Sequence, residues 1–436
     1  MGSADPEAFR EALLRGLRPG ADLRATLGDY ADLELKTGAE AGVLCEALRF
    51  YRDHPRADDE AFIRSPLHTL AGFFQQIAGE DAYARLKADG IPVLLELYDA
   101  RLAALERKPD DPLCGSELMF VLKILAYYPC EETLGRIVAA ARDPFNRGYM
   151  WSVVFSAFEE DHPLAGELID RLRRRLPDGF VGVAFLDLCN QRAGAGLLDR
   201  HPFNGEEGVK RLEACLRDSD PGAFSRAHSA TAALPFVDKP QRDGLLALAL
   251  DHIDPGVQLE AAWASAKVGS ENGLKKLIQS ASLPHCSARA VRYLEELGRA
   301  DAIPGQARDP DFKALAEMSE WLQHPNEFGR APDELALYDT REIFWPPTGD
   351  RRRVWLFKYA YRAKEPGGAD ERGMGMVGSI TFALFGETTD SLSPEDVYGM
   401  HCAWELQQTG DPAAPKDRGA DSGRAILRKH NPGAGF

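Results

Sequence analysis

Residues 254–298 read DPGVQLEAAWASAKVGSENGLKKLIQSASLPHCSARAVRYLEELG, and this stretch decides the expected fold. Asp254-Pro255 opens a segment whose alanines and leucines recur every three or four residues, which is the spacing of one face of an α-helix. Gly269 ends that segment, because glycine readily adopts the left-handed backbone of a helix C-terminus. Leu283-Pro284 and Gly298 bound another segment in the same way. The stretch therefore predicts short helices joined by tight turns.

The same breaks recur earlier in the chain. Asp220-Pro221-Gly222 lies 34 residues before Asp254-Pro255-Gly256, and Asp143-Pro144 lies about one such interval before Pro177-Asp178-Gly179. Proline in the first helical turn loses no backbone hydrogen bond, and a preceding aspartate can cap the exposed N–H groups. A period in the thirties with two helices in each unit predicts an α-solenoid.

These features resemble HEAT repeats. The resemblance rests on Asp254-Pro255, Val257, Ala261-Ala262, Val268-Gly269 and the pair Leu274 and Leu277. It is clearest for residues 205–300 and weaker from 110 to 205, and in residues 1–110 only the helical pattern supports it. The resemblance implies a curved stack of helix pairs with a concave binding face, and it does not imply one particular function.

The pattern changes from about residue 333. Leu335–Trp345, Val354–Tyr361 and Ser379–Phe385 have the composition and alternation of β-strands, and Ser393-Pro394 then opens a helix to about Gln408. We therefore expect a mainly α protein with a small C-terminal α+β segment, made of a three-stranded antiparallel sheet and one helix. This segment resembles regions beside HEAT arrays in bacterial proteins. The predicted organisation is a helical region at 1–110, HEAT-like repeats at 111–325, an α+β cap at 333–409 and a flexible tail at 410–436.

Composition narrows the class of protein. The 436 residues carry a formal net charge of −16, which favours solubility and disfavours non-specific binding to nucleic acid. The seven cysteines show no CxxC spacing, which argues against a zinc knuckle or a disulfide framework and suits a reducing, cytoplasmic compartment. No signal peptide, membrane span, metal site or cofactor site is expected.

Several motifs could carry chemistry, and for each the structural interpretation is favoured. The GxGxxG pattern at 373–378 is followed by a strand-like run rather than a helix, which favours a glycine-containing strand over a dinucleotide site. His285-Cys286 and His401-Cys402 are expected to be buried helix residues rather than catalytic pairs, because no third group that would orient a catalytic pair is evident. The acidic run 159–162 is expected to be a solvated helix end rather than a cation site.

Two arginine clusters and one group of aromatic residues are further candidates for a binding site. The arginines within 171–175 suit a helix C-terminus, and Arg351 to Arg353 lie at a turn, although either cluster could hold an anion. The aromatic residues Phe344, Trp345, Trp355, Phe357, Tyr359 and Tyr361 are predicted to form the core between the sheet and the 393–408 helix, and a partner-binding platform is the alternative.

The sequence therefore predicts a non-catalytic scaffold or adaptor that binds a protein partner. The alternative is a nucleic-acid-binding protein, because some HEAT-like proteins are DNA glycosylases that hold DNA in the concave groove with aromatic, acidic and basic residues. A bilin-lyase-like role is supported only by analogy of fold. The candidate binding residues are Trp263, Arg289, Arg292, Trp345, Arg351 and Arg352.

Overall fold

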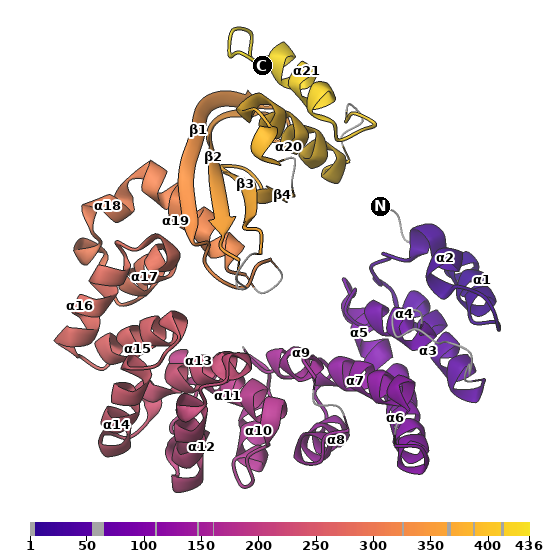
Figure 1. Ribbon diagram of the computed structural model, residues 1–436. Helices are drawn as coiled ribbons and strands as arrows, with labels where there is room; N and C mark the ends of the chain where they lie inside the picture. The colour runs from indigo at the N-terminus through magenta and orange to yellow at the C-terminus, as the bar shows by residue number, and fades with distance from the viewer. Residues whose placement is uncertain are drawn as a thin grey trace. The chain divides into compact units, whose positions relative to one another are not determined.

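The computed structural model describes residues 5–54, 65–109, 111–145, 148–159, 161–324, 327–363, 368–386, 389–410 and 414–436. These residues form a mainly helical protein with a small four-stranded antiparallel sheet near the C-terminus (Figure 1). The contacts divide the chain into two compact units, Met1–Leu245 and Leu246–Phe436, which is a coarser division than the four segments expected from the sequence.

The first unit is helical. Its helices are α1 (Pro6–Gly16), α2 (Leu23–Leu27), α3 (Gly38–Asp53), α4 (Pro66–Phe73), α5 (Glu80–Arg85), α6 (Ile91–Arg107), α7 (Pro112–Ala126), α8 (Glu131–Arg142), α9 (Met150–Ser156), α10 (Ala165–Leu172), α11 (Gly179–Gly194), α12 (Glu206–Arg217) and α13 (Phe224–Ala233). Helix α14 (Lys239–Leu250) spans the division between the units. Short turns of 3₁₀ helix lie at Gly28–Tyr30, Pro202–Asn204, Pro221–Ala223 and Leu234–Phe236, and Leu86–Gly90 forms a π-helical turn.

Within this unit the later helices form two layers. Helix α7 packs on α9, α9 on α11 and α11 on α13, so these four form one row. Helices α6, α8, α10 and α12 lie along one side of that row (Figure 1). Large side chains fill the space between helices, and Trp151, Phe155, Phe158 and Phe185 are all fully buried.

The second unit joins helices to the sheet. Its elements are α15 (Pro255–Lys267), α16 (Glu271–Ser280), α17 (Pro284–Glu296), α18 (Gly305–Arg308), α19 (Pro310–Leu322), β1 (Glu334–Trp345), β2 (Asp350–Tyr361), β3 (Glu371–Val377), β4 (Phe382–Phe385), α20 (Pro394–Gln408) and α21 (Ala420–His430), with 3₁₀ turns at Ala300–Ala302 and Thr389–Ser391. The expected helix boundaries at Asp254-Pro255, Gly269, Pro284 and Gly298 are confirmed, and both glycines have a positive φ. The Asp254 carboxylate accepts a hydrogen bond from the Val257 amide at 2.9 Å, which caps α15.

The sheet has four strands in the order β1-β2-β3-β4, and the prediction of three strands is wrong. The additional strand, β3, ends at Val377 and includes all of the GxGxxG pattern except Gly378, so the interpretation of that pattern as a glycine-containing strand is confirmed for residues 373–377. A side chain at Gly373 would lie 2.3 Å from the Leu384 carbonyl oxygen, and one at Gly375 would lie 2.4 Å from the Met318 sulfur. The glycines therefore allow β4 and α19 to approach β3 closely.

Helices cover both faces of the sheet. The predicted aromatic stripe on β2, from Trp355 to Tyr361, packs against α19 instead of α20. The opposite face, which includes Trp345, Leu356 and Met374, packs against α20 and α21. The stripe therefore lies in a core, but that core is not the one predicted. The reason is that β2 carries apolar side chains on both faces, as strands buried on both sides do.

The C-terminal residues do not form the flexible tail that their composition suggested. Residues 420–430 form α21, which packs along α20. The Leu427 side chain is fully buried, and Phe436 joins the same core. The predicted helix after Ser393 is confirmed as α20, with a capping box formed by Ser393 and Asp396.

Candidate functional site

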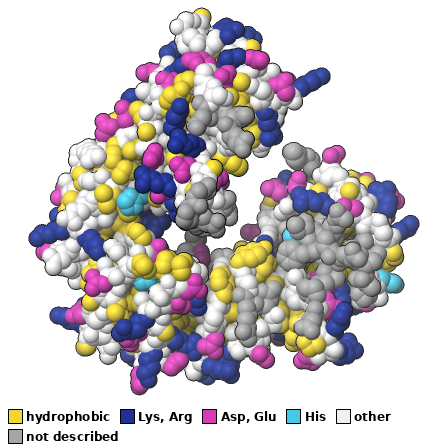
Figure 2. Space-filling model, viewed as in Figure 1, with side chains coloured by type: hydrophobic (Ala, Val, Ile, Leu, Met, Phe, Trp, Pro, Cys, Tyr) yellow, Lys and Arg dark blue, Asp and Glu magenta, His cyan; other side chains and the backbone are white. Residues whose placement is uncertain are grey.

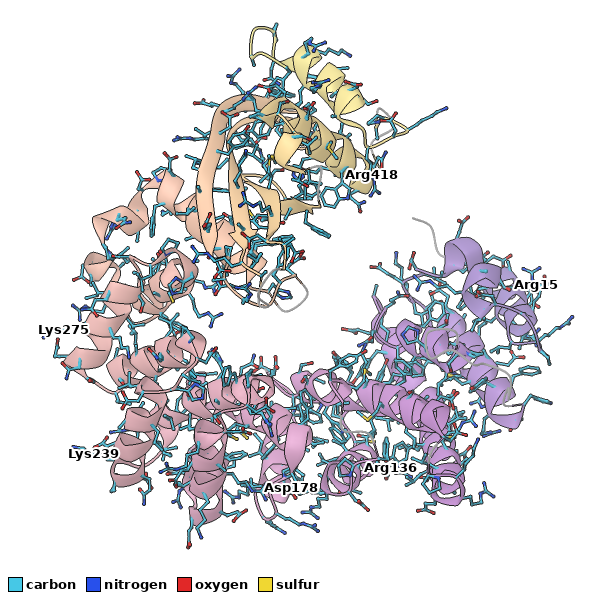
Figure 3. The ribbon with its side chains drawn as sticks, viewed as in Figure 1. Arg15, Arg136, Asp178, Lys239, Lys275 and Arg418 are labelled. Carbon is cyan, nitrogen blue, oxygen red and sulfur yellow. The ribbon has the colours of Figure 1, made fainter. Side chains whose placement is uncertain are left out.

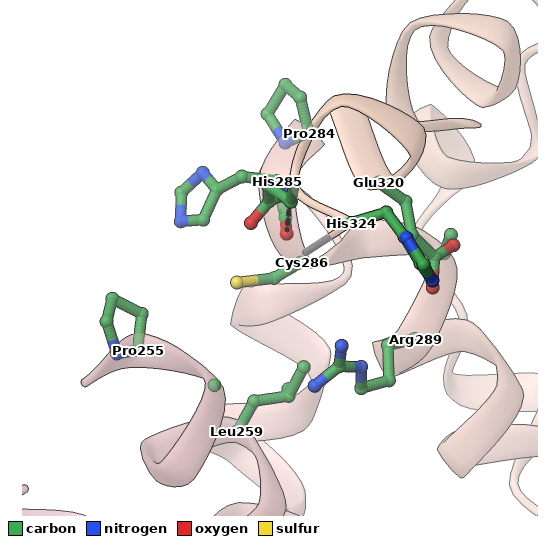
Figure 4. A pocket seen from close by; sticks show the side chains of 11 residues that line it. Pro255, Leu259, Pro284, His285, Cys286, Arg289, Glu320 and His324 are labelled. Atoms are coloured by element: carbon green, nitrogen blue, oxygen red, sulfur yellow. Dashed lines mark hydrogen bonds between the residues drawn. The ribbon is translucent and has the colours of Figure 1, made fainter. Parts of the chain in front are cut away.

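The second unit contains a pocket where the ends of three helices meet. The N-terminal turns of α15 and α17 form two of its walls, and the C-terminal turn of α19 forms the third (Figure 4). The cavity holds about 200 Å³. Its apolar lining comes from α15 and α17, and its polar lining comes mainly from α17 and α19: Pro255, Leu259, Pro284, Cys286 and Ala288 on the apolar side, and His285, Arg289, Glu320, Gln323 and His324 on the polar side.

Hydrogen bonds between the helix ends hold the pocket in shape. Gln323 Nε2, at the end of α19, donates to the carbonyl oxygen of His285 at 3.2 Å and to that of Ser319 at 2.9 Å. Ser287 Oγ, in the first turn of α17, donates to the carbonyl oxygen of Ala281 at 2.7 Å. The bond from Gln323 to His285 joins the α19 wall to the α17 wall.

Charge is distributed unevenly around the pocket. In Figure 4 the guanidinium of Arg289 lies between Leu259 on one side and Glu320 and His324 on the other. The Glu320 carboxylate is paired with Arg292 Nη2 at 2.7 Å, and the Arg292 side chain is 64% exposed. The ion pair with Arg292 balances the negative charge of Glu320, and Arg289 places a guanidinium on the polar side of the pocket.

The thiol in the pocket is not activated. Burial raises the pKa of Cys286 above its ordinary value, although the nearby Arg289 charge acts in the opposite direction. A nucleophilic cysteine requires the thiolate, which a raised pKa disfavours at neutral pH. Cys286 therefore contributes a small, protonated, apolar surface to the pocket.

The structure places Trp263 differently from the sequence expectation. Trp263 was expected to be available in a groove, but it is only 7% exposed and its ring lies beneath Lys267 Nζ at 4.5 Å and beside the Tyr293 ring at 5.4 Å. The Tyr293 hydroxyl donates to Glu260 in the same cluster. Trp263 is therefore a packing residue between α15 and α17, so it does not offer an open stacking surface for a base.

Trp345 is also buried. It has no exposed surface, and its indole Nε1 donates to Glu405 Oε2 at 2.9 Å, so it cannot anchor a partner at the surface. Arg351 and Arg352 were expected in a turn, but they lie in the first residues of β2, where they pair with Phe344 and Ile343 of β1, outside the pocket. Arg351 donates to the Glu342 carbonyl oxygen at 3.3 Å. The hydrogen bond from Arg352 lowers the pKa of Asp350 to about 2, with a smaller contribution from Thr348.

The pair His401-Cys402 is structural. His401 lies between the rings of Trp345, Phe382 and Trp404, and its Nε2 lies 3.3 Å from Glu405 Oε2. Burial raises the pKa of Cys402 to about 12. Burial would raise the pKa of Glu405 as well, but the contacts with His401, Ser379 and Trp345 outweigh it, and the pKa is lowered.

The two remaining charged motifs lie in the first unit. Arg171 pairs with Glu131 and Glu167, and Arg173 pairs with Asp170, so these arginines are engaged with acidic neighbours around the end of α10. The acidic run 159–162 lies partly outside the described residues. Within the described ranges, no group of three or more His, Cys, Asp and Glu side chains is arranged to hold a metal ion.

Sequence reasoning found part of this pocket. It singled out Arg289 and Arg292, which border the Glu320 carboxylate, but it missed Glu320, Gln323 and His324. These residues come from α19, about 30 residues farther along the chain, and no local motif marks them. The sequence also gave no signal that Trp263 would be covered by Lys267 rather than open to solvent.

Two general findings complete the description. In the part of the chain that the structure describes, no helix combines the length and the apolar character needed to cross a bilayer. Comparison with models of known protein families, with curated proteins and with solved structures found no match to this chain.

Proposed function

We propose that this chain is a non-catalytic scaffold of stacked, HEAT-type helix pairs, and that a protein partner inserts a side chain into the pocket between α15, α17 and α19. The observation that carries the proposal is the pocket itself, which is apolar on one side and carries the polar and charged side chains of His285, Arg289 and Glu320 on the other. Small apolar cavities with one convergent charged group are where protein interfaces place their anchor residues.

The size of the cavity supports a protein partner over a small-molecule substrate. Sites for small molecules and cofactors usually enclose about 300 to 1,000 Å³. The present pocket, at about 200 Å³, is smaller and suits one amino-acid side chain. The protonated Cys286 thiol adds support for a binding role without catalysis.

The character of the partner group follows from the lining. Leu259, Pro284 and Ala288 suit an aliphatic or aromatic side chain, and Arg289 suits an adjacent carboxylate or carbonyl group of the partner. The solenoid arrangement is supported by the recurrent aspartate- and proline-initiated helices and by the row from α7 to α13. The seven free cysteines suit a reducing compartment, and we place the protein in the cytoplasm.

Affinity capture with the full chain tests this proposal. Ala288→Trp fills the pocket, and Arg289→Glu reverses its charge. Lys275→Glu is the matched control, because Lys275 is exposed on α16 and points outward (Figure 3). We expect the wild type and Lys275→Glu to retain one protein at a fixed stoichiometry, and both pocket variants to lose at least nine tenths of it. Equal retention by all four chains, or no reproducible partner, would contradict the proposal.

A further inference from the structure

The two edges of the sheet differ in how they are protected. Exposed edge strands offer unpaired backbone N–H and C=O groups to other chains, and proteins usually block them with charges, bulges or covering segments. β1 and β4 are the two edges of this sheet (Figure 1). Within the described ranges, β1 is blocked by charges, a bulge and a covering side chain, and β4 has none of these three.

β1 carries three of these protections. Its pairing with β2 is interrupted by a bulge between Leu337 and Asp339. Its residues include the charged side chains Glu334, Asp339, Arg341 and Glu342. At its far end the Asn431 side chain acts as a substitute for a neighbouring strand, because Asn431 Oδ1 accepts from the Phe344 amide at 2.7 Å and Asn431 Nδ2 donates to the Phe344 carbonyl at 2.9 Å.

Among the described residues, the short length of β4 is its one protection. Its four residues, Phe382–Phe385, are all apolar, and they pair with β3 without a register shift. Among the described residues, no backbone hydrogen bond joins β4 to any segment other than β3. Phe385 is 66% exposed, and Ile380, just before the strand, is 46% exposed.

Aromatic rings stand beside this edge on both faces of the sheet. On the face toward α19, Phe385 lies edge-on to Phe328 with ring centroids 6.2 Å apart. On the face toward α20, Phe382 lies 5.7 Å from the Trp404 ring. An added strand would therefore place successive side chains alternately against these two pairs of rings.

We propose that the outer edge of β4 receives an extended, apolar segment of a partner protein as a fifth strand. Strand addition supplies backbone hydrogen bonds for affinity and contacts for alternate side chains for specificity. A second copy of this chain fits less well, because a strand of four residues spans only about 14 Å. Stable protein–protein interfaces bury about 1,200 to 2,000 Å² in total, and two such short edges would provide little of that. This inference goes beyond the pocket, since the two surfaces share no residue.

The test uses the full chain as bait and a displayed library of random decapeptides as the probe. We expect the enriched peptides to contain β-branched or aromatic residues at alternate positions and to lack proline in that run. The best peptide should bind Phe385→Lys and Ile380→Lys at least tenfold more weakly than the wild type. Leu337→Lys is the matched control, because Leu337 is 43% exposed on the blocked edge, and it should bind like the wild type.

Hydrogen exchange adds a second readout in the same experiment. Bound peptide should slow exchange of amides in 382–385 and leave those in 334–338 unchanged. Ala288→Trp should bind the peptide normally, which separates this inference from the proposal for the pocket. The inference is overturned if no peptide is enriched, if Phe385→Lys binds as well as the wild type, or if Leu337→Lys loses as much affinity. A concentration-dependent dimer that Phe385→Lys abolishes would also overturn it, in favour of a second copy.

Discussion

A buried carboxylate joins three segments of the first unit. Glu117 on α7 pairs with Arg101 Nε on α6 at 2.7 Å, and its side chain is 2% exposed. It also accepts hydrogen bonds from the Tyr51 hydroxyl at 2.7 Å and from Ser65 Oγ at 3.2 Å. Removing one partner of a buried ion pair leaves the other charge without compensation, which costs far more than the pair contributes in net stability.

Glu117→Ala should therefore lower the free energy of unfolding by about 3 to 5 kcal/mol. Glu206→Ala is the control, because the Glu206–Lys210 pair lies at the surface with side chains 85% and 65% exposed, and its loss should leave the free energy of unfolding nearly unchanged. Urea unfolding followed by circular dichroism measures both changes. If Glu117→Ala had an effect as small as that of the control, the contacts of Glu117 with Arg101, Tyr51 and Ser65 would contribute little to stability.

His201 makes the first unit sensitive to acid. Burial lowers the pKa of this imidazole to about 4. Nδ1 accepts from the Phe203 amide at 3.3 Å, so the ring is neutral, and Nε2 faces the Asn190 side-chain oxygen at 3.1 Å. The unfolded chain, with a histidine pKa near 6.5, takes up a proton first as the pH falls.

The stability due to His201 is thus present above about pH 6.5 and is lost as the pH falls toward 4, by up to about 3 kcal/mol. His201→Asn keeps a side-chain acceptor for the Phe203 amide and removes the titration, so its unfolding free energy should fall less over that interval. His54→Asn, at an exposed site, is the matched substitution. Urea unfolding at half-unit steps of pH distinguishes them, and parallel profiles for all three chains would refute this assignment.

At the scale of elements, two glycines set the contact between α20 and α21. A side-chain carbon at Gly423 would lie 1.7 Å from the carbonyl oxygen of Gly399, and one at Gly399 would lie 2.6 Å from the Ala420 carbonyl oxygen. Only glycine permits this approach. This close contact explains how α21, a short helix with few apolar residues, remains packed on α20.

Gly423→Ala should force the two helices apart and destabilise the second unit by about 1 to 3 kcal/mol, despite the higher helix propensity of alanine. Gly244→Ala is the matched change, since that helical glycine has no atom within 4 Å of an added carbon, and it should stabilise the protein by about 0.5 to 1 kcal/mol. Thermal unfolding should show opposite shifts. A stabilising Gly423→Ala would contradict the close packing.

Helices and strands whose ends are set by neighbouring residues could be predicted from the sequence. Those that are held in place by residues far away in the chain could not. The starts of α15 and α20 follow from a capping side chain before a proline, and both were predicted. β3 was not counted among the strands of the sheet, although its glycine pattern was interpreted as a strand, because those glycines disfavour a strand locally and are required by the close approach of β4 and α19. α21 was missed because its Gly- and Arg-rich sequence lacks a clear apolar stripe, although Leu427 and Phe436 are buried.

In the molecule as a whole, the candidate site could likewise be predicted only in part from the sequence. Arg289 was identified because it lies in the stretch with the most regular sequence pattern, whereas the α19 residues that complete the pocket could be found only from the fold. Acidic and basic side chains are interspersed over the visible surface (Figure 2), and the net charge of the chain is −16.

That charge leads to a prediction about nucleic acid. Binding to a duplex without sequence preference depends on neutralising phosphates with basic side chains, and a strongly acidic protein is repelled at long range. We expect no mobility shift of a 30-base-pair duplex, intact or with an abasic site, at about 150 mM salt, where non-specific affinities are weak even for basic proteins. A shift that weakens steeply with salt would instead favour the nucleic-acid alternative.

The central claim is that a partner protein occupies the pocket between α15, α17 and α19, and site-specific photocrosslinking tests it most directly. A photoreactive phenylalanine derivative replaces His285, which is exposed at the rim, and in a second chain it replaces Lys275 on α16. The account predicts one discrete crosslinked protein from position 285, none from position 275, and loss of the crosslink when Ala288→Trp is added. Equal labelling from both positions, or a crosslink that survives Ala288→Trp, would contradict it.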